Sequence, residues 1–121
     1  MKTKKTLIIG ASPKESRYSY MAVTKLAELG HEAIPVSIKH GVIAGINMII
    51  GMPKIDDVHT VTLYVGPQNQ PPYYDYILSL KPKRVIFNPG TENDEFYEIL
   101  KGNNIEVLVA CTLVLLGTGQ Y

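Results

Sequence analysis

The sequence predicts an α/β fold: a Rossmann-like three-layer sandwich with a mostly parallel sheet. Short apolar segments without alternating polarity, such as residues 6–9, are typical of strands that are buried on both faces. These segments alternate along the chain with segments of helical spacing, which favours parallel pairing and right-handed crossovers. The 121 residues are enough for one hydrophobic core, and we expect a single domain over residues 1–121.

The first unit of this pattern is a strand, a turn and a helix. The strand at residues 6–9 is stopped by the turn at residues 10–13, because glycine and proline interrupt strands. Ser19 is expected to cap the following helix, since its hydroxyl can accept a free N–H of the first turn. Apolar residues at helical spacing continue up to Gly30, where we expect the helix to end.

The second strand is expected at residues 32–37, near an edge of the sheet or incompletely paired, because Pro35 has no N–H to donate. Residues 38–57 are rich in Ile, Met, Val and Gly and are the hardest part of the chain to assign. We expect at most a short edge strand within residues 47–50 and a turn at residues 54–57.

The rest of the chain alternates strands and helices. Strands are expected at residues 60–65, 84–87 and 105–110, and helices at residues 70–80 and 92–101. Pro71 and Pro72 are tolerated in the first turn of a helix, because the first amides of a helix have no partner to lose. Residues 111–116 are expected to form an apolar tail.

The composition excludes several classes of partner. The 12 Lys and Arg residues nearly balance the 11 Asp and Glu residues without forming a basic stripe, so nucleic acid is not expected. No segment approaches the ~20 apolar residues of a membrane span. Cys111 is the single cysteine, which suits a reducing compartment, and we expect a cytoplasmic protein. The composition is compatible with a homo-oligomer and does not decide the oligomeric state.

The turn after the first strand is a candidate anion site. The free N–H groups and positive end of a following helix point back at such a turn and favour a phosphate there. Further donors stand close by in the sequence, namely Ser12, Lys14, Arg17 and Ser19. The dinucleotide fingerprint G-x-G-x-x-G is absent. The alternative, that Gly10 and Ser19 only make a turn and a cap, stays open.

Small or turn-forming residues also follow the later strands. Ligands of open parallel sheets bind outside the carboxyl ends of the strands, so the segments at 10–12, 37–39, 66–67 and 88–90 would converge on one crevice. Domains that bind NAD usually carry Asp or Glu after the second strand, but here Ser37 and Lys39 stand there. A serine and a lysine favour a nucleotide with a ribose phosphate, such as coenzyme A (CoA) or NADP, unless Lys39 is simply a solvated lysine.

An ordered set of segments resembles the small stand-alone CoA-binding proteins, which share the Rossmann-like domain of the succinyl-CoA synthetase α subunit. The segments that carry the resemblance are residues 10–13, 17–20, 34–36 with Lys39, 57–58, 88–93 and 110–114. The resemblance implies a phosphate site, a lysine contact to CoA and a pantetheine path. By position these roles fall on Gly10, Ala11, Ser12, Arg17 and Tyr18, on Lys39, and on Val65, Gly66, Asn88 and Pro89.

The chain offers no clear catalytic or metal-binding group. No grouping of His, Cys, Asp and Glu has metal-ligand spacing, and no nucleophile–base pair is visible. Cys111 has no basic neighbour in the sequence, so we expect an inert thiol. Tyrosines at or near helix starts, which are Tyr18, Tyr20, Tyr73, Tyr74 and Tyr76, suit stacking on adenine, a subunit contact or simple packing.

The sequence therefore favours a small protein that binds CoA or an acyl-CoA and is non-catalytic on its own. It lacks the separate phosphohistidine domain of the synthetase subunit, so CoA ligation by this chain alone is not expected. One alternative is an NADP-dependent reductase with the same fold. Another is a degenerate domain that has lost its ligand and serves as a protein-interaction module, as the apolar segments at 41–53 and 113–116 would suggest.

Overall fold

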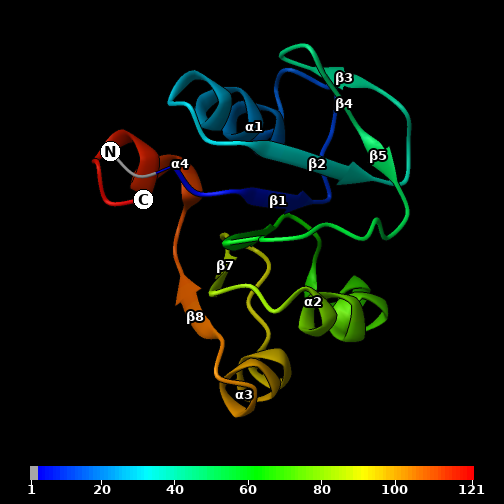
Figure 1. Cartoon of the computed structure of the whole chain (residues 1–121), viewed down its shortest axis with the longest axis vertical. Coiled ribbons are helices and arrows are strands. Elements are labelled where there is room, and N and C mark those ends of the chain that lie inside the picture. The colour runs from blue at the N-terminus through cyan, green and yellow to red at the C-terminus, as the bar shows by residue number, and fades with distance from the viewer. Residues whose placement is uncertain (1–2) are drawn as a thin grey trace.

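A six-stranded sheet forms the middle layer of the computed structural model, which describes residues 3–121 (Figure 1). The strand order is β5-β2-β1-β6-β7-β8, and every pairing within this sheet is parallel. The predicted domain also includes residues 1 and 2, which lie outside the described residues. The strands are β1 (Thr6–Ile9), β2 (Ala33–Ser37), β5 (Ile49–Ile50), β6 (Thr60–Leu63), β7 (Arg84–Phe87) and β8 (Glu106–Val109).

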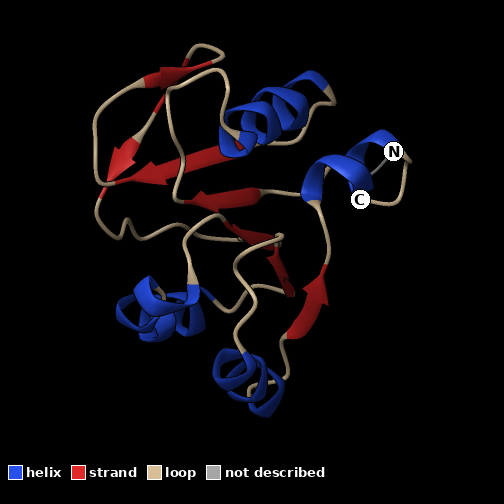
Figure 2. Cartoon of the chain, turned by 180° about the vertical axis from the view of Figure 1, so that it is seen from behind, coloured by secondary structure: helices blue, strands red, loops and turns tan. Residues whose placement is uncertain are grey.

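Helices cover both faces of this sheet (Figure 2). On one side lie α1 (Tyr18–Glu28) and α4 (Thr112–Gly117), and on the other lie α2 (Tyr74–Leu80) and α3 (Asp94–Gly102). The side chains of β1 alternate between the two resulting cores: Ile8 packs with α1, whereas Leu7 and Ile9 pack with α2 and α3. The predicted α/β Rossmann-like sandwich is confirmed.

The central strand β1 is buried over its whole length, as its uninterrupted apolar sequence predicts. Leu7, Ile8 and Ile9 are each 0% exposed. Burying a side chain of this size stabilises the fold by roughly 1.5–3 kcal/mol. The partial pairing of β2 is also as expected, because β5 pairs only with Val36 and Ser37 and leaves Pro35 without a partner on that side.

The start of α1 differs from the prediction. Ser19 is not the cap: the helix begins at Tyr18, Arg17 is its N-cap residue, and no side chain caps it. The buried residues of α1 are Ser19, Ala22, Val23 and Leu26, which follow the i, i+3, i+4, i+7 spacing of one helix face. Ser19 opens this buried face, and it must therefore be helical itself.

The segments without long periodicity were the least predictable. Residues 111–116 were expected to be an apolar tail, but Thr112–Gly117 form α4, whose Leu116 packs into the core with α1. Within residues 38–57, β5 falls inside the expected range, but the hairpin of β3 (Val42–Ile43) and β4 (Ile46–Asn47) was not expected. Its turn has positive φ at both Ala44 and Gly45, and alanine gives no signal for such a turn.

The helix expected at residues 70–80 is shorter than predicted. Two 3₁₀ turns, η1 (Pro67–Asn69) and η2 (Pro71–Tyr73), precede α2, which begins only at Tyr74. Proline lacks an N–H and restricts the residue before it, so consecutive prolines favour separate short turns over a continuous helix.

Two histidines pack at the amino ends of the strands. His31 is buried, and its Nδ1 accepts the backbone N–H of Lys4 at 2.9 Å. The Nδ1 atom of His59 lies 2.7 Å from the Thr60 hydroxyl. Burial, and then the positive charges of Lys4 and Arg84, lower the pKa of both histidines below the usual 6.5.

We therefore predict that acid weakens the fold. A histidine whose folded-state pKa is lowered contributes stability that is complete above the unfolded pKa of 6.5 and is lost as the pH falls through 6.5 toward the folded value. Urea unfolding should give a smaller free energy of unfolding at pH 5.5 than at pH 7.5.

His31→Asn should reduce this difference between the two pH values. The matched control is His40→Asn, which removes an exposed histidine and should leave the difference unchanged. Equal pH dependence in the wild type and in His31→Asn would show that His31 does not carry the effect.

Candidate functional site

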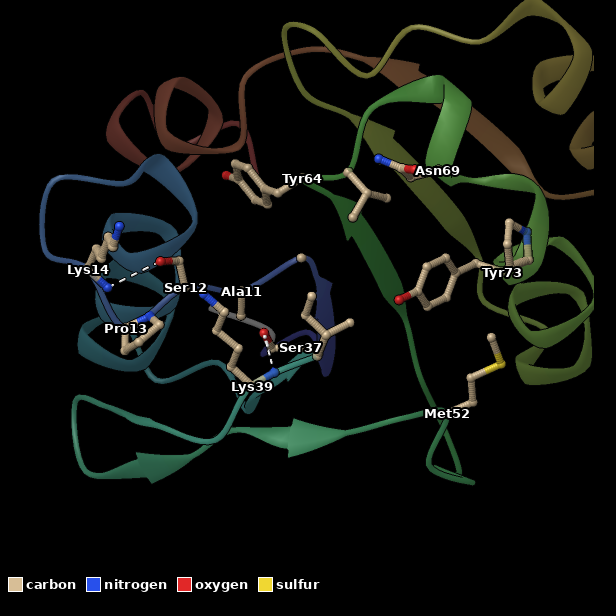
Figure 3. A pocket seen from close by; sticks show the side chains of 14 residues that line it. Ala11, Ser12, Pro13, Lys14, Ser37, Lys39, Met52, Tyr64, Asn69 and Tyr73 are labelled. Atoms are coloured by element: carbon tan, nitrogen blue, oxygen red, sulfur yellow. Dashed lines mark hydrogen bonds between the residues drawn. The ribbon is translucent and has the colours of Figure 1, made fainter.

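A cavity of about 610 Å³ lies at the carboxyl ends of β1, β2 and β6 (Figure 3). Its walls come from the turn after β1, the loop after β2, Met52, and the segment that leads from β6 to α2. A volume of this size is typical of sites for small organic ligands. The lining residues are Gly10, Ala11, Ser12, Pro13, Lys14, Ser37, Ile38, Lys39, Met52, Tyr64, Val65, Asn69, Pro72 and Tyr73.

The structure brings part of the predicted site together. The predicted residues that line the cavity are Gly10, Ala11, Ser12, Ser37, Lys39 and Val65. The predicted residues outside its lining are Arg17, Tyr18, Gly66, Asn88 and Pro89. Arg17 and Tyr18 are exposed at the start of α1, with Tyr18 70% exposed, and thus they lie at the surface. The ends of β1, β2 and β6 converge as expected, whereas Asn88 and Pro89, at the end of β7, do not line the cavity.

Gly10 is required by packing rather than by access of a ligand. Its φ is +90°, and an added Cβ would lie 2.9 Å from Val65 Cγ1 and 3.0 Å from the carbonyl carbon and oxygen of Tyr64. The backbone N–H groups of Gly10 and Ala11 both donate to the carbonyl of Val36 at 3.0 Å. These two amides hold the ends of β1 and β2 together, and so they are not free donors for a phosphate.

The positive charge of the cavity comes from two lysines on its polar side. Lys14 and Lys39 each follow a serine by two residues, and each backbone N–H donates to that serine's hydroxyl, at 3.2 Å from Ser12 and 3.3 Å from Ser37. Figure 3 shows both lysines on the same side of the cavity. Among the described residues that line it, none is acidic. The cavity is therefore suited to an anionic ligand.

The opposite side of the cavity is largely apolar. Figure 3 places Met52 and Tyr73 there, facing the lysines across the opening. Val65 and Pro72 complete this wall, and Met52 is 48% exposed. The site thus pairs a cationic side with an apolar side, which fits a ligand that has phosphates at one end and an uncharged arm.

Tyr64 lines the cavity where β6 ends. Burial is the main cause that raises the pKa of its hydroxyl well above the usual 10. The phenol therefore stays protonated at physiological pH, and it is a poor candidate for a general base.

A buried amide explains why the end of β7 does not reach the cavity. Asn88 is 2% exposed, and its Nδ2 donates to Thr62 Oγ1 at 2.6 Å and to the Leu63 carbonyl at 2.8 Å. Its Oδ1 accepts the N–H of Thr112 at 2.9 Å. The Thr112 hydroxyl lies 2.8 Å from that of Thr62. Asn88 therefore links β6, β7 and the start of α4, with its amide fully engaged.

A second buried amide holds the apolar wall. Gln70 is 0% exposed, and its Nε2 donates to the carbonyls of Val65 at 3.0 Å and Thr91 at 2.7 Å. Its Oε1 accepts a hydrogen bond from Asn93 at 2.9 Å. Asn93 also donates to the Tyr74 hydroxyl and caps α3 by accepting the N–H of Phe96. The loops after β6 and β7 are thus fixed to each other behind the cavity.

Several lining residues had only weak signals in the sequence. Met52 and Asn69 reach the cavity because of how loops fold, which no motif indicated, whereas Ile38 belongs to the segment 37–39 that was expected there. Of the five tyrosines that we singled out, only Tyr73 lines the cavity. Tyr74 stacks on Phe96, with ring centroids 4.2 Å apart.

The single thiol of the chain lies away from the cavity. Cys111 is half-buried at the start of α4, outside the cavity lining. Within residues 3–121, no group of three or more His, Cys, Asp and Glu side chains is placed to hold a metal ion. None of the described helices is both long enough and apolar enough to span a membrane.

The chain is similar to known domains over nearly its whole length. A family model described as a CoA binding domain matches residues 4–117. The crystal structure of an uncharacterized protein is 55% identical over 100% of both chains, with a TM-score of 0.97. A hypothetical protein from Pyrococcus horikoshii OT3 is 25% identical, with 93% of this chain and 80% of that chain covered and a TM-score of 0.83. No curated protein matches the chain.

A further similarity, to a conserved hypothetical protein from Pyrococcus furiosus, shows the fold alone. The two chains are 23% identical, with 92% of this chain and 97% of that chain covered and a TM-score of 0.80.

The crowding at Gly10 gives a stability prediction. Gly10→Ala should lower the free energy of unfolding by roughly 1–3 kcal/mol, because it combines a strained φ with contacts near 3.0 Å to backbone atoms. The matched control is Gly90→Ala, since Gly90 has φ +92° but open space where a Cβ would stand. Urea unfolding should show a clearly larger loss for Gly10→Ala, and equal losses would contradict the packing role.

Proposed function

The chain belongs to the CoA binding domain family, and we propose that it binds CoA or an acyl-CoA in the cavity at the carboxyl ends of β1, β2 and β6. The observation that carries this proposal is the pairing of Lys14 and Lys39 with an apolar wall inside one cavity. CoA has the same division, since phosphates stand at one end and the uncharged pantetheine arm at the other.

The two lysines suit different phosphates of the ligand. Lys39 and Ser37 follow β2, where nucleotide-binding folds contact the ribose, so we assign them to the 3′-phosphate. Lys14 and Ser12 lie in the turn after β1, where such folds hold a pyrophosphate, so we assign them to the pyrophosphate. Both lysines are exposed, and each contact should therefore contribute modestly.

The apolar wall suits the pantetheine arm. Val65, Pro72, Tyr73 and Met52 would pack along the arm and exclude water from it. The buried amide of Gln70 fixes the backbone at Val65, so this wall is held in place before a ligand arrives. Preformed walls reduce the conformational entropy that binding costs.

We propose binding without catalysis, so that the protein acts as a carrier, sensor or accessory module. Tyr64 keeps its proton because burial raises the pKa of its hydroxyl, and no carboxylate among the described lining residues is available to take a proton. Cys111 lies outside the lining. These observations support a ligand-binding role over proton-transfer chemistry at this site.

Two alternatives have observations in their favour. Ser37 and Lys39 would equally suit the ribose phosphate of NADP, and so an NADP-dependent reductase stays the second candidate. Exposed apolar side chains within residues 38–52 favour the interaction module, namely Ile38, Val42 in β3, Ile50 in β5 and Met52. Ile38 and Met52 also line the cavity, so a ligand would cover part of this surface.

We predict that CoA binds better than dephospho-CoA, by roughly five- to thirtyfold at low salt, because one charge-assisted contact separates the two ligands. Lys39→Ala should bring that ratio close to one and leave the affinity for dephospho-CoA nearly unchanged. Calorimetry at low and high salt measures the effect, and salt should shrink the ratio as it screens a surface pair.

Lys14→Ala should instead lower the affinities for CoA and dephospho-CoA by a similar factor, since both ligands carry the pyrophosphate. Lys101→Ala, an exposed lysine on α3, is the matched control and should change neither affinity. Equal affinity of the wild type for the two ligands would refute the assignment of Lys39. Tighter binding of NADPH than of CoA would favour the reductase, and binding of neither would favour the interaction module.

A further inference from the structure

A second cavity lies beside the one proposed for CoA. Its volume is about 390 Å³. Sites for small ligands usually have about 300–1,000 Å³, so this space is large enough for part of a ligand. Its walls come from residues 52–57 and from α2. Met52 lines both cavities, and its side chain therefore stands between them.

The two cavities follow the same helical stretch. Tyr73 lines the first cavity, and Tyr76, three residues further along, lines the second. Residues three apart in a helical stretch lie on the same side of it. Both cavities are therefore placed along one side of this stretch, one after the other.

The backbone is fixed on either side of Met52. Ile50 pairs with Ser37 in the sheet, and the Tyr76 hydroxyl donates a hydrogen bond to the carbonyl of Pro53. Only Gly51 and Met52 lie between these two fixed points. The Met52 side chain itself is 48% exposed, unbranched and able to change rotamer. A movement of this side chain alone would join the two cavities.

The end of the pantetheine arm reaches this point in the proposed binding mode. The phosphates lie by Lys14 and Lys39, and Figure 3 shows Met52 and Tyr73 across the opening from them. The arm packs along that apolar wall and ends in the thiol that carries the acyl group of an acyl-CoA. An acyl group on this thiol would therefore lie next to the second cavity.

The lining of the second cavity narrows the choice of acyl group. Met52, Ile55 and Leu80 give it apolar surface. Its charged residues are Asp56, Asp57 and Lys54, so carboxylates outnumber the ammonium group. An uncharged acyl chain can bury its methylenes against the apolar surface, whereas a carboxylate on the chain would be repelled.

We propose that the protein prefers an acyl-CoA with a short, uncharged acyl chain, which occupies the second cavity when the Met52 side chain moves aside. This inference rests on the proposed function, because it takes the CoA part of the ligand to lie in the first cavity. Met52 is then the residue at which the protein distinguishes acyl-CoA from CoA, since free CoA leaves the second cavity empty.

Calorimetry of the full chain with CoA, acetyl-CoA, butyryl-CoA and malonyl-CoA tests this preference. Each buried methylene should tighten binding by up to about fourfold, so butyryl-CoA should bind roughly tenfold more tightly than acetyl-CoA. Malonyl-CoA, whose acyl group carries a carboxylate, should bind no more tightly than CoA. Butyryl-CoA should be the tightest of the four ligands.

Ser79→Tyr tests where the acyl group lies. Ser79 is an exposed residue of α2 that lines the second cavity but not the first, so a bulky side chain there should fill this space without disturbing the core. Butyryl-CoA should lose its advantage over CoA, while the affinity for CoA stays as in the wild type. Asp75→Tyr is the matched control: Asp75 is exposed on the same helix and lines neither cavity, so this variant should keep the advantage.

The outcomes separate this inference from the proposed function. If none of the four ligands binds, both are refuted. If CoA binds but butyryl-CoA binds no more tightly, or if malonyl-CoA binds as tightly as butyryl-CoA, the preference for an uncharged acyl chain is wrong and the proposed function stands. An unchanged advantage of butyryl-CoA in Ser79→Tyr would place the acyl group outside the second cavity and overturn the inference as well.

Discussion

The structure depends on one close contact, in which Gly10, in the turn after β1, packs against the end of β6. Gly10 lies so close to Tyr64 and Val65 that a single added carbon would stand 2.9–3.0 Å from them. At the same place, the backbone N–H groups of Gly10 and Ala11 donate hydrogen bonds to the carbonyl of Val36, which fixes the end of β2 beside that of β1. The carboxyl ends of β1, β2 and β6 are therefore held close together. The cavity is the space that this junction leaves open above it.

Buried amides extend this constraint to the far wall. Hydrogen bonds of the Asn88 side chain link β7 to β6 and to the start of α4. Those of the Gln70 side chain link the loop after β6 to the loop after β7. Removing one partner of such a network leaves buried polar groups unsatisfied, which costs about 1–3 kcal/mol for each group. The network therefore gives the apolar wall a fixed position.

The sequence predicted the sheet well because buried strands carry their signal in a few consecutive apolar residues. Gly10, Ser37 and Lys39, which the sequence singled out, all line the cavity, although Gly10 is required there by packing. Asn88 was predicted as a ligand contact, but the structure engages its amide in the core. Ser19 was predicted to cap α1, but it lies inside the helix and opens its buried face. The six residues of α4 are too few to show helical periodicity. Met52 and Asn69 could not be foreseen, since loop paths rather than local spacing bring them to the cavity.

The most direct test of the central claim follows backbone amide NMR signals of the full chain during titration with CoA. We expect the signals of residues 10–14, 37–39 and 65–73 to shift together and saturate at one affinity, because these segments line one cavity. Signals of His59 and Arg84 should stay in place. If CoA binds but its largest shifts fall outside those three segments, or if no signal moves at saturating CoA, the cavity is not the CoA site.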